Sequence, residues 1–191
     1  MNSYTNRPFK KPRITNNDRQ LALLKSRLTP EMKYIDTSTS AALDSHDIVT
    51  LLNGTAEGIA STERIGTQLR MTSIHFQATL ENAINDLEHD MVRLFVVYDH
   101  QSNGALPSYT DIFKNASDVL AVRNLNNRQR FTVVFDSKVI SLPAQAVAGP
   151  TYVGVNPVHT YVNRYRNCNL TVNYKGTTAA IGDVSSGALL L

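Results

Sequence analysis

Strict alternation of apolar and polar side chains over residues 74–80 is the feature that most limits how this chain can fold. The apolar members of the pattern share one face: Ile74, Phe76, Ala78 and Leu80. A period of two is typical of a β-strand with one buried and one solvent face. Just upstream, Leu69 and Met71 have the opposite phase, which indicates either a β-bulge or a strand buried on both sides.

Other segments carry strand signals as well. Residues 91–98 form a nearly continuous apolar run, which predicts a buried strand. In residues 130–140 the alternation predicts one face made of Phe131, Val133 and Phe135. Further strands are expected at 32–38, 46–52 and 158–174.

The connections between these segments are expected to contain little helix. A turn is expected at Ser102-Asn-Gly104, and a short helix is expected to begin after Ser108, with Asp111 completing a capping box, and to end near Asn115. Many strands, short turns and one or two small helices predict an all-β sandwich or barrel.

Charge is distributed unevenly along the chain. Residues 1–33 hold eight Lys and Arg against two acidic residues, whereas the rest of the chain holds eleven basic and fourteen acidic residues. The segment Arg7-Pro-Phe-Lys-Lys-Pro-Arg13 is too charged and too proline-rich to join a core. We therefore expect a basic arm over residues 1–31 that binds a polyanion, followed by a body over residues 32–191.

One helix is expected inside the arm. Asp18 is in position to cap an amphipathic helix over residues 18–28, because Leu21, Leu24 and Leu28 follow at helical spacing. Thr29-Pro30 is expected to end it, since the residue before a proline disfavours the α region.

The sequence contains no constellation of an enzyme or a metal site. Its five His residues lack the spacing of zinc ligands, and Gly54-Thr-Ala-Glu-Gly58 is not followed by the Gly-Lys of a phosphate loop. Ser45, His46 and Asp47 are adjacent in sequence, and adjacent residues on a strand point to opposite faces, so they cannot assemble a catalytic triad. We therefore expect no enzymatic activity, no metal and no cofactor.

Three further features bound the cellular setting. The single Cys168 cannot form a disulfide within the chain, which fits a reducing compartment. No apolar run approaches the roughly 18 residues that span a bilayer, and the N-terminal residues do not have the composition of a secretory signal. We expect neither export nor a membrane partner.

Several blocks, in consistent order over about residues 52–189, resemble a known family. They are Leu52-Asn-Gly-Thr-Ala-Glu-Gly58, Arg64-Ile-Gly-Thr-Gln-Leu-Arg-Met-Thr-Ser-Ile74, Val92-Arg-Leu-Phe-Val-Val-Tyr-Asp99, Asn103-Gly-Ala-Leu-Pro107, Asp111-Ile-Phe113, Asn124-Leu-Asn-Asn-Arg-Gln-Arg-Phe131, Asn173-Tyr-Lys-Gly176 and Ile181-Gly-Asp-Val-Ser-Ser-Gly-Ala-Leu189. This series resembles the capsid proteins of small circular, Rep-encoding single-stranded DNA viruses. It is also similar to the coat proteins of satellite plant RNA viruses of the tobacco necrosis type.

The resemblance implies a single jelly roll of two four-stranded sheets, of which about 60 copies close an icosahedral shell. It implies that the arm packages single-stranded DNA, with RNA as the alternative, and that the same cations address a host nuclear-import receptor. The protein would then occupy the virion and, during assembly, the host nucleus. The expected nucleic-acid contacts are Arg7, Lys10, Lys11, Arg13, Arg19, Lys25, Arg27 and Lys33 of the arm and its junction, together with Arg123, Arg128 and Arg130, for which salt bridges between subunits are the alternative.

The sequence departs from that family at its last residues. Leu189-Leu-Leu191 ends in what should be mid-strand, about twenty residues short of the family's last strand. The final strand is then missing, replaced by another pairing, or built from separated N-terminal pieces. A missing strand would leave an unpaired edge within a sheet.

Other classes of protein compete with the shell subunit. A nucleic-acid-binding protein that forms no shell, such as a viral movement or shuttle protein, would share the arm and use exposed aromatic residues beside cations. Tyr161 and Tyr165, near Arg164 and Arg166, are the best such group, with packing in the core or between subunits as the alternative. A sugar-binding lectin or a cupin enzyme is disfavoured by the lack of a His and Glu metal set.

Overall fold

The structure is a computed structural model, and it describes residues 16–27, 32–42, 48–82, 89–115, 118–144 and 159–191. Contacts divide the chain into two compact units, Met1–Lys33 and Tyr34–Leu191. The body is mostly β, with two antiparallel sheets and few helices, which confirms the all-β class.

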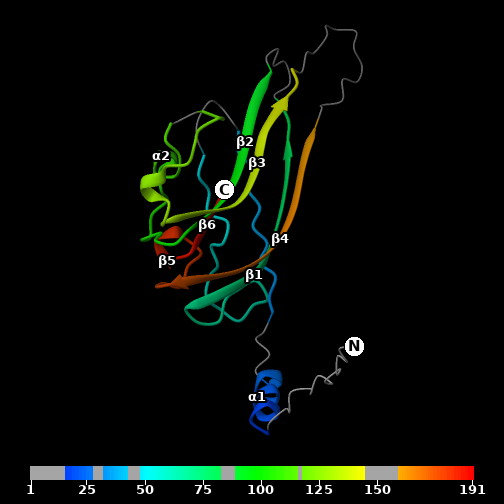
Figure 1. The fold of residues 1–191 in the computed structure, drawn as a ribbon, viewed down its shortest axis with the longest axis vertical. Coiled ribbons are helices and arrows are strands. Elements are labelled where there is room, and N and C mark those ends of the chain that lie inside the picture. Colours follow the sequence, from blue (N-terminus) through cyan, green and yellow to red (C-terminus); the bar gives the residue numbers. More distant parts are fainter. Residues whose placement is uncertain (1–15, 28–31, 43–47, 83–88, 116–117, 145–158) are drawn as a thin grey trace, which may run out of the picture. The chain divides into compact units, whose positions relative to one another are not determined.

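The first unit contains helix α1, Asn16–Arg27 (Figure 1). The expected helix is therefore present but begins earlier than predicted. Asp18 lies in the first turn rather than at the cap, so the prediction that it caps the helix was wrong; a carboxylate in the first turn still favours the helix dipole. The side chains of Leu21, Leu23 and Leu24 are exposed.

The second unit holds two three-stranded sheets (Figure 1). In one sheet the order of strands is β1-β4-β5, and in the other it is β3-β2-β6. Every pairing is antiparallel. The bounds are β1 Gln68–Leu80, β2 Asp90–Asp99, β3 Phe131–Leu142, β4 Thr160–Tyr174, β5 Val184–Ser186 and β6 Ala188–Leu190.

A short stretch before β1 extends the second sheet. Thr50 and Leu191 exchange backbone hydrogen bonds of 2.8 and 2.9 Å, and Leu52 N–H donates to Leu189 O at 2.7 Å. Because Leu190 also pairs with Val97 of β2, strand β6 has a neighbour on both edges. The sheet therefore reads β3-β2-β6 and then residues 50–52. Of the three alternatives for the final strand, the structure shows the last, because an N-terminal piece pairs with β6 and leaves no unpaired edge there.

Two of the expected strands upstream of β1 are reduced or absent. Residues 32–38 contain no strand, and this segment reaches the sheet through the Thr37 hydroxyl, which donates to Leu52 O at 2.7 Å. The expected strand at 46–52 survives only as the pairing at 50–52; residues 43–47 lie outside the described residues.

The register shift expected near Met71 is present, but its extra residue lies on β4, since the step from Met71 to Ser73 faces the longer step from Leu170 to Asn167. A bulge in β3 was not foreseen. Pairing with β4 shifts between Met71 and Ser73, which brings Leu69 and Met71 to the same side as Ile74. In β3, Val134 is the extra residue opposite β2. The expectation that Phe131, Val133 and Phe135 share one face was therefore wrong, because the bulge sends Phe135 toward Phe76 of β1, 5.6 Å between ring centroids.

A third layer covers the outer face of β2 and β3. Helix α2, Tyr109–Ile112, begins after Ser108, whose backbone N–H donates to the Asp111 carboxylate at 2.9 Å, as expected of a capping box. Its Ile112 and the following Phe113 pack with Val97 of β2. The expected turn before it is also present, with positive φ at Asn103 and Gly104. Two 3-10 helices, η1 Leu125–Asn127 and η2 Ile181–Asp183, complete the elements.

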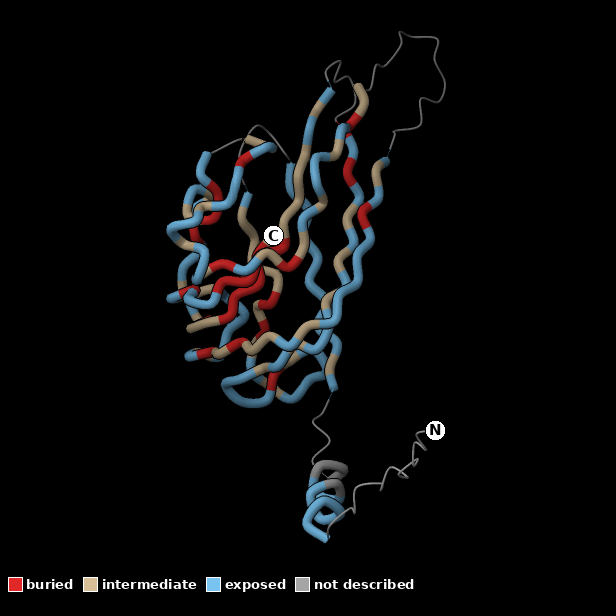
Figure 2. Tube along the Cα trace, viewed as in Figure 1, coloured by how far each residue is buried: buried red, intermediate tan, exposed pale blue. Residues whose placement is uncertain are grey.

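The remaining core lies between the two sheets. Buried residues gather around β6 and the adjoining end of β2, whereas much of β1 and β4 is exposed (Figure 2). The chain passes from β5 in one sheet to β6 in the other at Gly187, which has φ +83°. A Cβ there would lie 2.3 Å from Thr171 O, so only glycine fits.

Candidate nucleic-acid interface

Two polar residues of the resembling blocks around residues 52–74, Asn53 and Arg64, are buried and bond within the chain.

Asn53 is buried and joins both sheets near Gly187. Its side-chain Nδ2 donates to Gly187 O at 2.9 Å, and its side-chain Oδ1 accepts from Leu189 N–H at 2.8 Å. Its backbone carbonyl accepts from the Tyr174 hydroxyl at 2.6 Å. Every polar atom of the side chain is thus used inside the chain.

Arg64 is the second buried polar residue in these blocks, with 0% of its surface exposed. Its guanidinium donates to the carbonyls of Thr55, Gly66 and Gly176, and lies 4.3 Å from the centre of the Tyr174 ring. Arg64 therefore ties the loop before β1 to the end of β4. Its Nη1 also lies 3.5 Å from the Glu57 carboxylate, so its charge is balanced within the chain.

The cations expected in the arm are only partly described. Arg7, Lys10, Lys11 and Arg13 lie outside the described residues. Arg19 is exposed on α1, Lys25 and Arg27 belong to the same helix, and Lys33 is half-buried. All eight belong to the first unit, Met1–Lys33.

The cations expected on the body lie close in sequence but in different environments. Arg123 is held by pairing with Phe113, and its Nη2 donates to Phe131 O at 2.8 Å. Arg128, at the end of η1, is exposed. Arg130 forms a two-pronged ion pair with Asp99, at 2.9 and 2.8 Å, and this hydrogen bond raises the pKa of the Arg130 guanidinium. Asp99 has 0% exposure, so Arg130 offsets a buried charge within its own chain.

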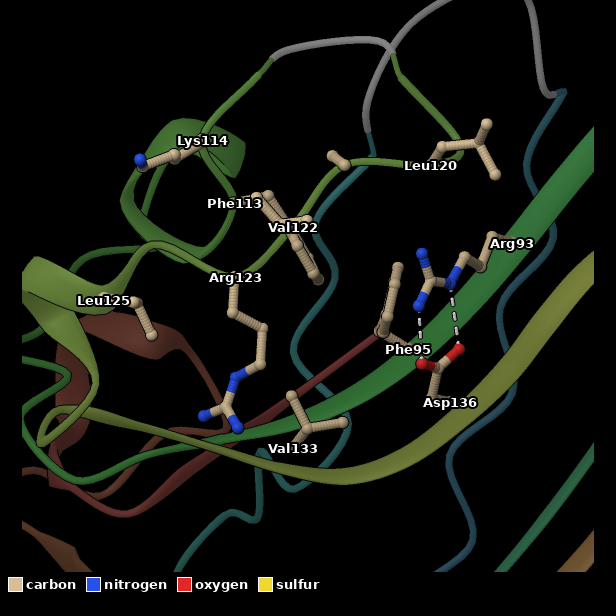
Figure 3. Close-up of a pocket in the computed structure, with 11 residues that line it drawn as sticks. Arg93, Phe95, Phe113, Lys114, Leu120, Val122, Arg123, Leu125, Val133 and Asp136 are labelled. Carbon is tan, nitrogen blue, oxygen red and sulfur yellow. Dashed lines mark hydrogen bonds and ion pairs between the residues drawn. The ribbon is translucent and has the colours of Figure 1, made fainter.

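An open groove of about 590 Å³ lies between the α2 layer and the sheet (Figure 3). Phe95, Phe113 and Val133 give it an apolar floor, and Arg123 and Lys114 lie along it. The side chains of Leu120, Val122 and Leu125 at this groove are exposed.

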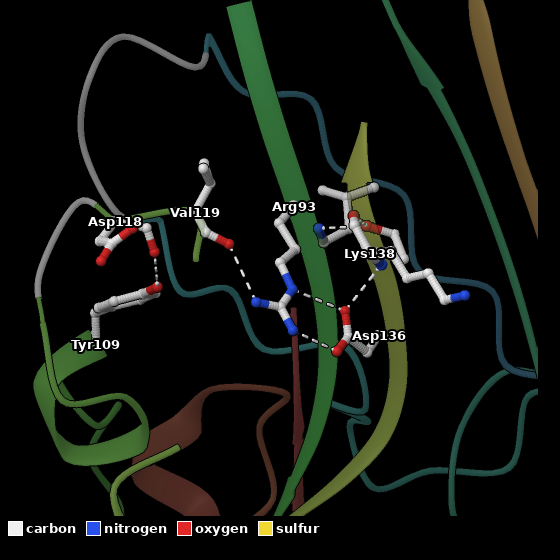
Figure 4. A network of polar contacts seen from close by, with 8 residues as sticks. Arg93, Tyr109, Asp118, Val119, Asp136 and Lys138 are labelled. Carbon is white, nitrogen blue, oxygen red and sulfur yellow. Dashed lines mark hydrogen bonds and ion pairs between the residues drawn. The ribbon is translucent and has the colours of Figure 1, made fainter. Parts of the chain in front are cut away.

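One carboxylate lies in the groove, and an arginine neutralises it. Arg93 binds Asp136 through two hydrogen bonds of 2.9 and 2.7 Å, and its third nitrogen donates to Val119 O at 3.1 Å (Figure 4). The hydrogen bond from Arg93 lowers the pKa of Asp136, and the Lys138 N–H, which donates to Asp136 at 2.9 Å, lowers it further. With its carboxylate paired, the groove combines an apolar floor with the cationic side chains of Arg123 and Lys114.

The tyrosines and arginines that the sequence analysis grouped together lie on opposite faces of β4. Tyr161 and Tyr165 are 74% and 63% exposed on the outer face of the β1-β4 pair. Arg164 and Arg166 point the other way, with Arg164 near the Phe135 ring and Arg166 donating to Val134 O of β3. The expected grouping of these tyrosines with these arginines was therefore wrong, and so was core packing of the tyrosines.

Neighbours of the tyrosines were missed by the sequence reasoning. His75 lies opposite Tyr165, with the two rings edge to face at 6.2 Å, and its Nε2 lies within hydrogen-bond distance of Asn163 Oδ1, at 2.9 Å. The Tyr165 hydroxyl donates to Asn167 at 3.1 Å. The signal was available, because residues alternating along β1 and β4 share this face.

Comparison with protein-family models and with curated proteins finds no match to this chain. Within the described part of the chain, no helix is both long enough and apolar enough to cross a membrane. Among the same residues, no group of three or more His, Cys, Asp and Glu side chains is placed to hold a metal ion.

Proposed function

We propose that this protein is a viral capsid protein whose body assembles with copies of itself into a small icosahedral shell and whose basic arm packages a single-stranded genome. The proposal combines three elements: the resemblance of the ordered sequence blocks, the order of the strands and the separation of charge between arm and body. The order of the strands carries it.

The strand order supports a jelly roll. Along the chain, residues 50–52 belong to one sheet, β1 to the other, β2 and β3 to the first, β4 and β5 to the second, and β6 to the first again. Such repeated crossing between two antiparallel sheets, with the last strand inserted beside the first, is typical of Greek-key sandwiches. Jelly rolls of this kind form viral shells.

The charge separation supports packaging by the arm. Eight cations and two carboxylates give residues 1–33 a net charge of +6, whereas the body has an excess of acidic residues. An extended cationic segment binds phosphates without reading sequence, and the release of counterions drives that binding. About 60 arms in a closed shell would supply on the order of 360 positive charges for the genome. Single-stranded DNA copied in a nucleus would also give the cluster a use as an import signal.

A second candidate is a nucleic-acid-binding protein that forms no shell. The exposure of Tyr161 and Tyr165 favours it, because exposed aromatic rings are the usual platforms for unpaired bases. This candidate shares the arm and differs only in assembly.

Assembly state separates the two candidates. We expect the purified chain to form megadalton particles in size-exclusion chromatography and closed shells in negative-stain images, since each subunit must contact several copies. A protein that stays monomeric at every concentration and salt level, and binds nucleic acid as a monomer, would support the second candidate instead.

Packaging tests the arm. Replacing Arg7, Lys10, Lys11 and Arg13 together by Ala is expected to yield particles that have lost their nucleic acid, read from the ultraviolet absorbance ratio. The salt dependence of binding to single-stranded DNA should fall by a slope of about 3, since each phosphate contact contributes about 0.7. A matched control exchanges each Lys for Arg and each Arg for Lys, which keeps the charge and should keep the nucleic acid. Equal nucleic-acid content in the Ala variant and the wild type would refute the role of the arm.

A further inference from the structure

The outer face of the β1-β4 pair has no covering layer among the described residues, unlike the outer face of β2 and β3. On this face β1 presents polar side chains at alternate positions, and β4 presents Tyr161, Tyr165 and a series of asparagines. We name it the tyrosine face, defined by Arg70, His75, Gln77, Thr79, Tyr161, Asn163, Tyr165, Asn167 and Asn169.

The two tyrosine rings are spaced along one strand and are held in place. At about 3.3 Å per residue, Tyr161 and Tyr165 lie about 13 Å apart along β4. The Tyr165 hydroxyl is fixed by Asn167, and His75 stands against the ring edge to face. Tyr161 lies opposite Thr79 and has His159 beside it, 6.1 Å between ring centroids. Both rings are mostly in solvent despite these contacts.

Groups that can read a base edge lie between the rings. A groove of about 330 Å³ is lined by Gln77, Thr79, Tyr161 and Asn163. Amides and hydroxyls both donate and accept hydrogen bonds, which suits the polar edges of unpaired bases. The groove and the rings therefore combine stacking surface with hydrogen-bonding groups.

The charge of this sheet suits a polyanion. None of the residues of β1, β4 and β5 is Asp or Glu, and Glu81, which directly follows β1, is paired with His159 at 2.9 Å. Arg70 lies on the tyrosine face, where its Nε donates to Asn169 Oδ1. The other sheet, by contrast, contains Asp90, Asp99 and Asp136.

A second copy of the chain is the competing occupant. Stable interfaces between subunits have an apolar centre. Apart from its two tyrosine rings, the tyrosine face consists of amides, hydroxyls, one imidazole and one guanidinium, so it offers little apolar area for such a centre.

We propose that the tyrosine face binds single-stranded nucleic acid, with bases stacked on Tyr161 and Tyr165 and a phosphate near Arg70. This rests on the proposed function, because it assigns a second contact to the same nucleic acid that the arm packages. The arm supplies salt-dependent attraction, and the tyrosine face supplies stacking that depends little on salt.

The test uses the full chain with its four arm cations replaced by Ala, so that the arm does not mask the face. The probe is a short fluorescein-labelled oligo(dT), followed by anisotropy in a salt concentration at which the protein is disassembled. Tyr161→Leu and Tyr165→Leu are each expected to weaken binding about tenfold, since stacking on one aromatic ring is of that size. Tyr34→Leu, at an exposed tyrosine outside the face, is the matched control and should change nothing.

A second readout reports stacking directly. The chain has no Trp, so its emission comes from tyrosine. Binding of oligo(dT) should quench part of that emission, and the quenching should be lost in the double variant Tyr161→Leu with Tyr165→Leu. Arg70→Gln should lower the salt slope by about 0.7, the contribution of one phosphate.

The outcomes separate this inference from the proposed function. Unchanged oligo(dT) affinity and quenching in the tyrosine variants would overturn the tyrosine face, while packaging through the arm would stand. If the variants bind oligo(dT) normally but fail to form particles, the face is a contact between copies and the inference is wrong. If wild-type particles form and package nucleic acid normally, the proposed function stands whatever the tyrosine variants show.

Discussion

The two sheets of the body differ in whether their outer faces are covered. The β3-β2-β6 sheet packs on the other sheet on one side and on the α2 layer on the other, and four consecutive residues of β2, Val96 to Asp99, are buried. The β1-β4-β5 sheet buries at most one face, and from Asn163 to Asn167 the side chains of β4 are exposed on both faces.

This difference separates stability from recognition. A sheet that is covered on both faces contributes most of the free energy of folding, because each strand removes apolar surface from water twice. A sheet with one bare face can change its outer residues at little cost in stability. We therefore expect substitutions in the first sheet to alter folding and substitutions on the tyrosine face to alter binding.

The largest effect is expected at the centre of the covered sheet. Leu190→Ala removes a side chain that is 1% exposed and should lower the free energy of unfolding by about 3 kcal/mol, from lost burial and the cavity left behind. Urea denaturation measures it. Leu120→Ala, at an exposed leucine, is the control and should cost less than about 0.5 kcal/mol. Equal losses in the two variants would contradict the assignment of the core.

The next effect concerns the ion pair at the end of β2. Arg130→Ala leaves Asp99 buried without its partner and should cost about 2–3 kcal/mol, somewhat below a fully buried pair because Arg130 is 27% exposed. Affinity for single-stranded DNA should not change. Arg128→Ala should show the reverse pattern, with unchanged thermal stability and a slightly smaller salt slope. A DNA-binding defect in a fully stable Arg130→Ala protein would reinstate Arg130 as a nucleic-acid contact.

A smaller effect depends on pH. The pKa of Asp136 lies below its ordinary value of 3.8 because Arg93 hydrogen-bonds its carboxylate. A lowered carboxylate pKa stabilises the fold above the ordinary value, and this stabilisation is lost as the pH falls through the lowered pKa. Wild type should therefore lose up to about 1 kcal/mol more than Asp136→Asn on acidification below pH ~4, since the pair is partly exposed. Parallel stability curves for the two proteins would show that the pair contributes nothing.

The smallest effect on folding is expected on the tyrosine face. Tyr161→Leu and Tyr165→Leu should each change the free energy of unfolding by less than about 0.5 kcal/mol, because both rings are mostly in solvent. Chemical denaturation of the same samples used for binding measures this. A loss of several kcal/mol in either variant would place that tyrosine in the fold rather than in recognition.

Local patterns predicted the strands well where the phase of the pattern was visible. The shift at Met71 and Ser73 was readable because apolar residues change phase there. In β3 the extra residue is Val134, which is itself apolar, so the sequence kept an apparent alternation across the bulge. A bulge that inserts an apolar residue leaves no change of polarity to read.

Features that join distant residues were not predictable from local patterns. Residues 50–52 pair with β6 although Asn53 and Leu189, which bond to each other, are 136 positions apart. The burial of Arg64 depends on carbonyls from two separate loops. Within the candidate site, by contrast, the two-residue period of a strand would have been enough to place Tyr161 and Tyr165 on the opposite face from Arg164 and Arg166.

The central place of β6 also affects when the body can fold during synthesis. Its two neighbours, β2 and residues 50–52, leave the ribosome long before it does, and neither can pair with it until then. Since synthesis adds about 5–20 residues per second, the nascent chain keeps both edges open for several seconds. Translation that stalls before Ala188 would release a polypeptide with two unpaired edges, a substrate for chaperones or proteases and not for assembly.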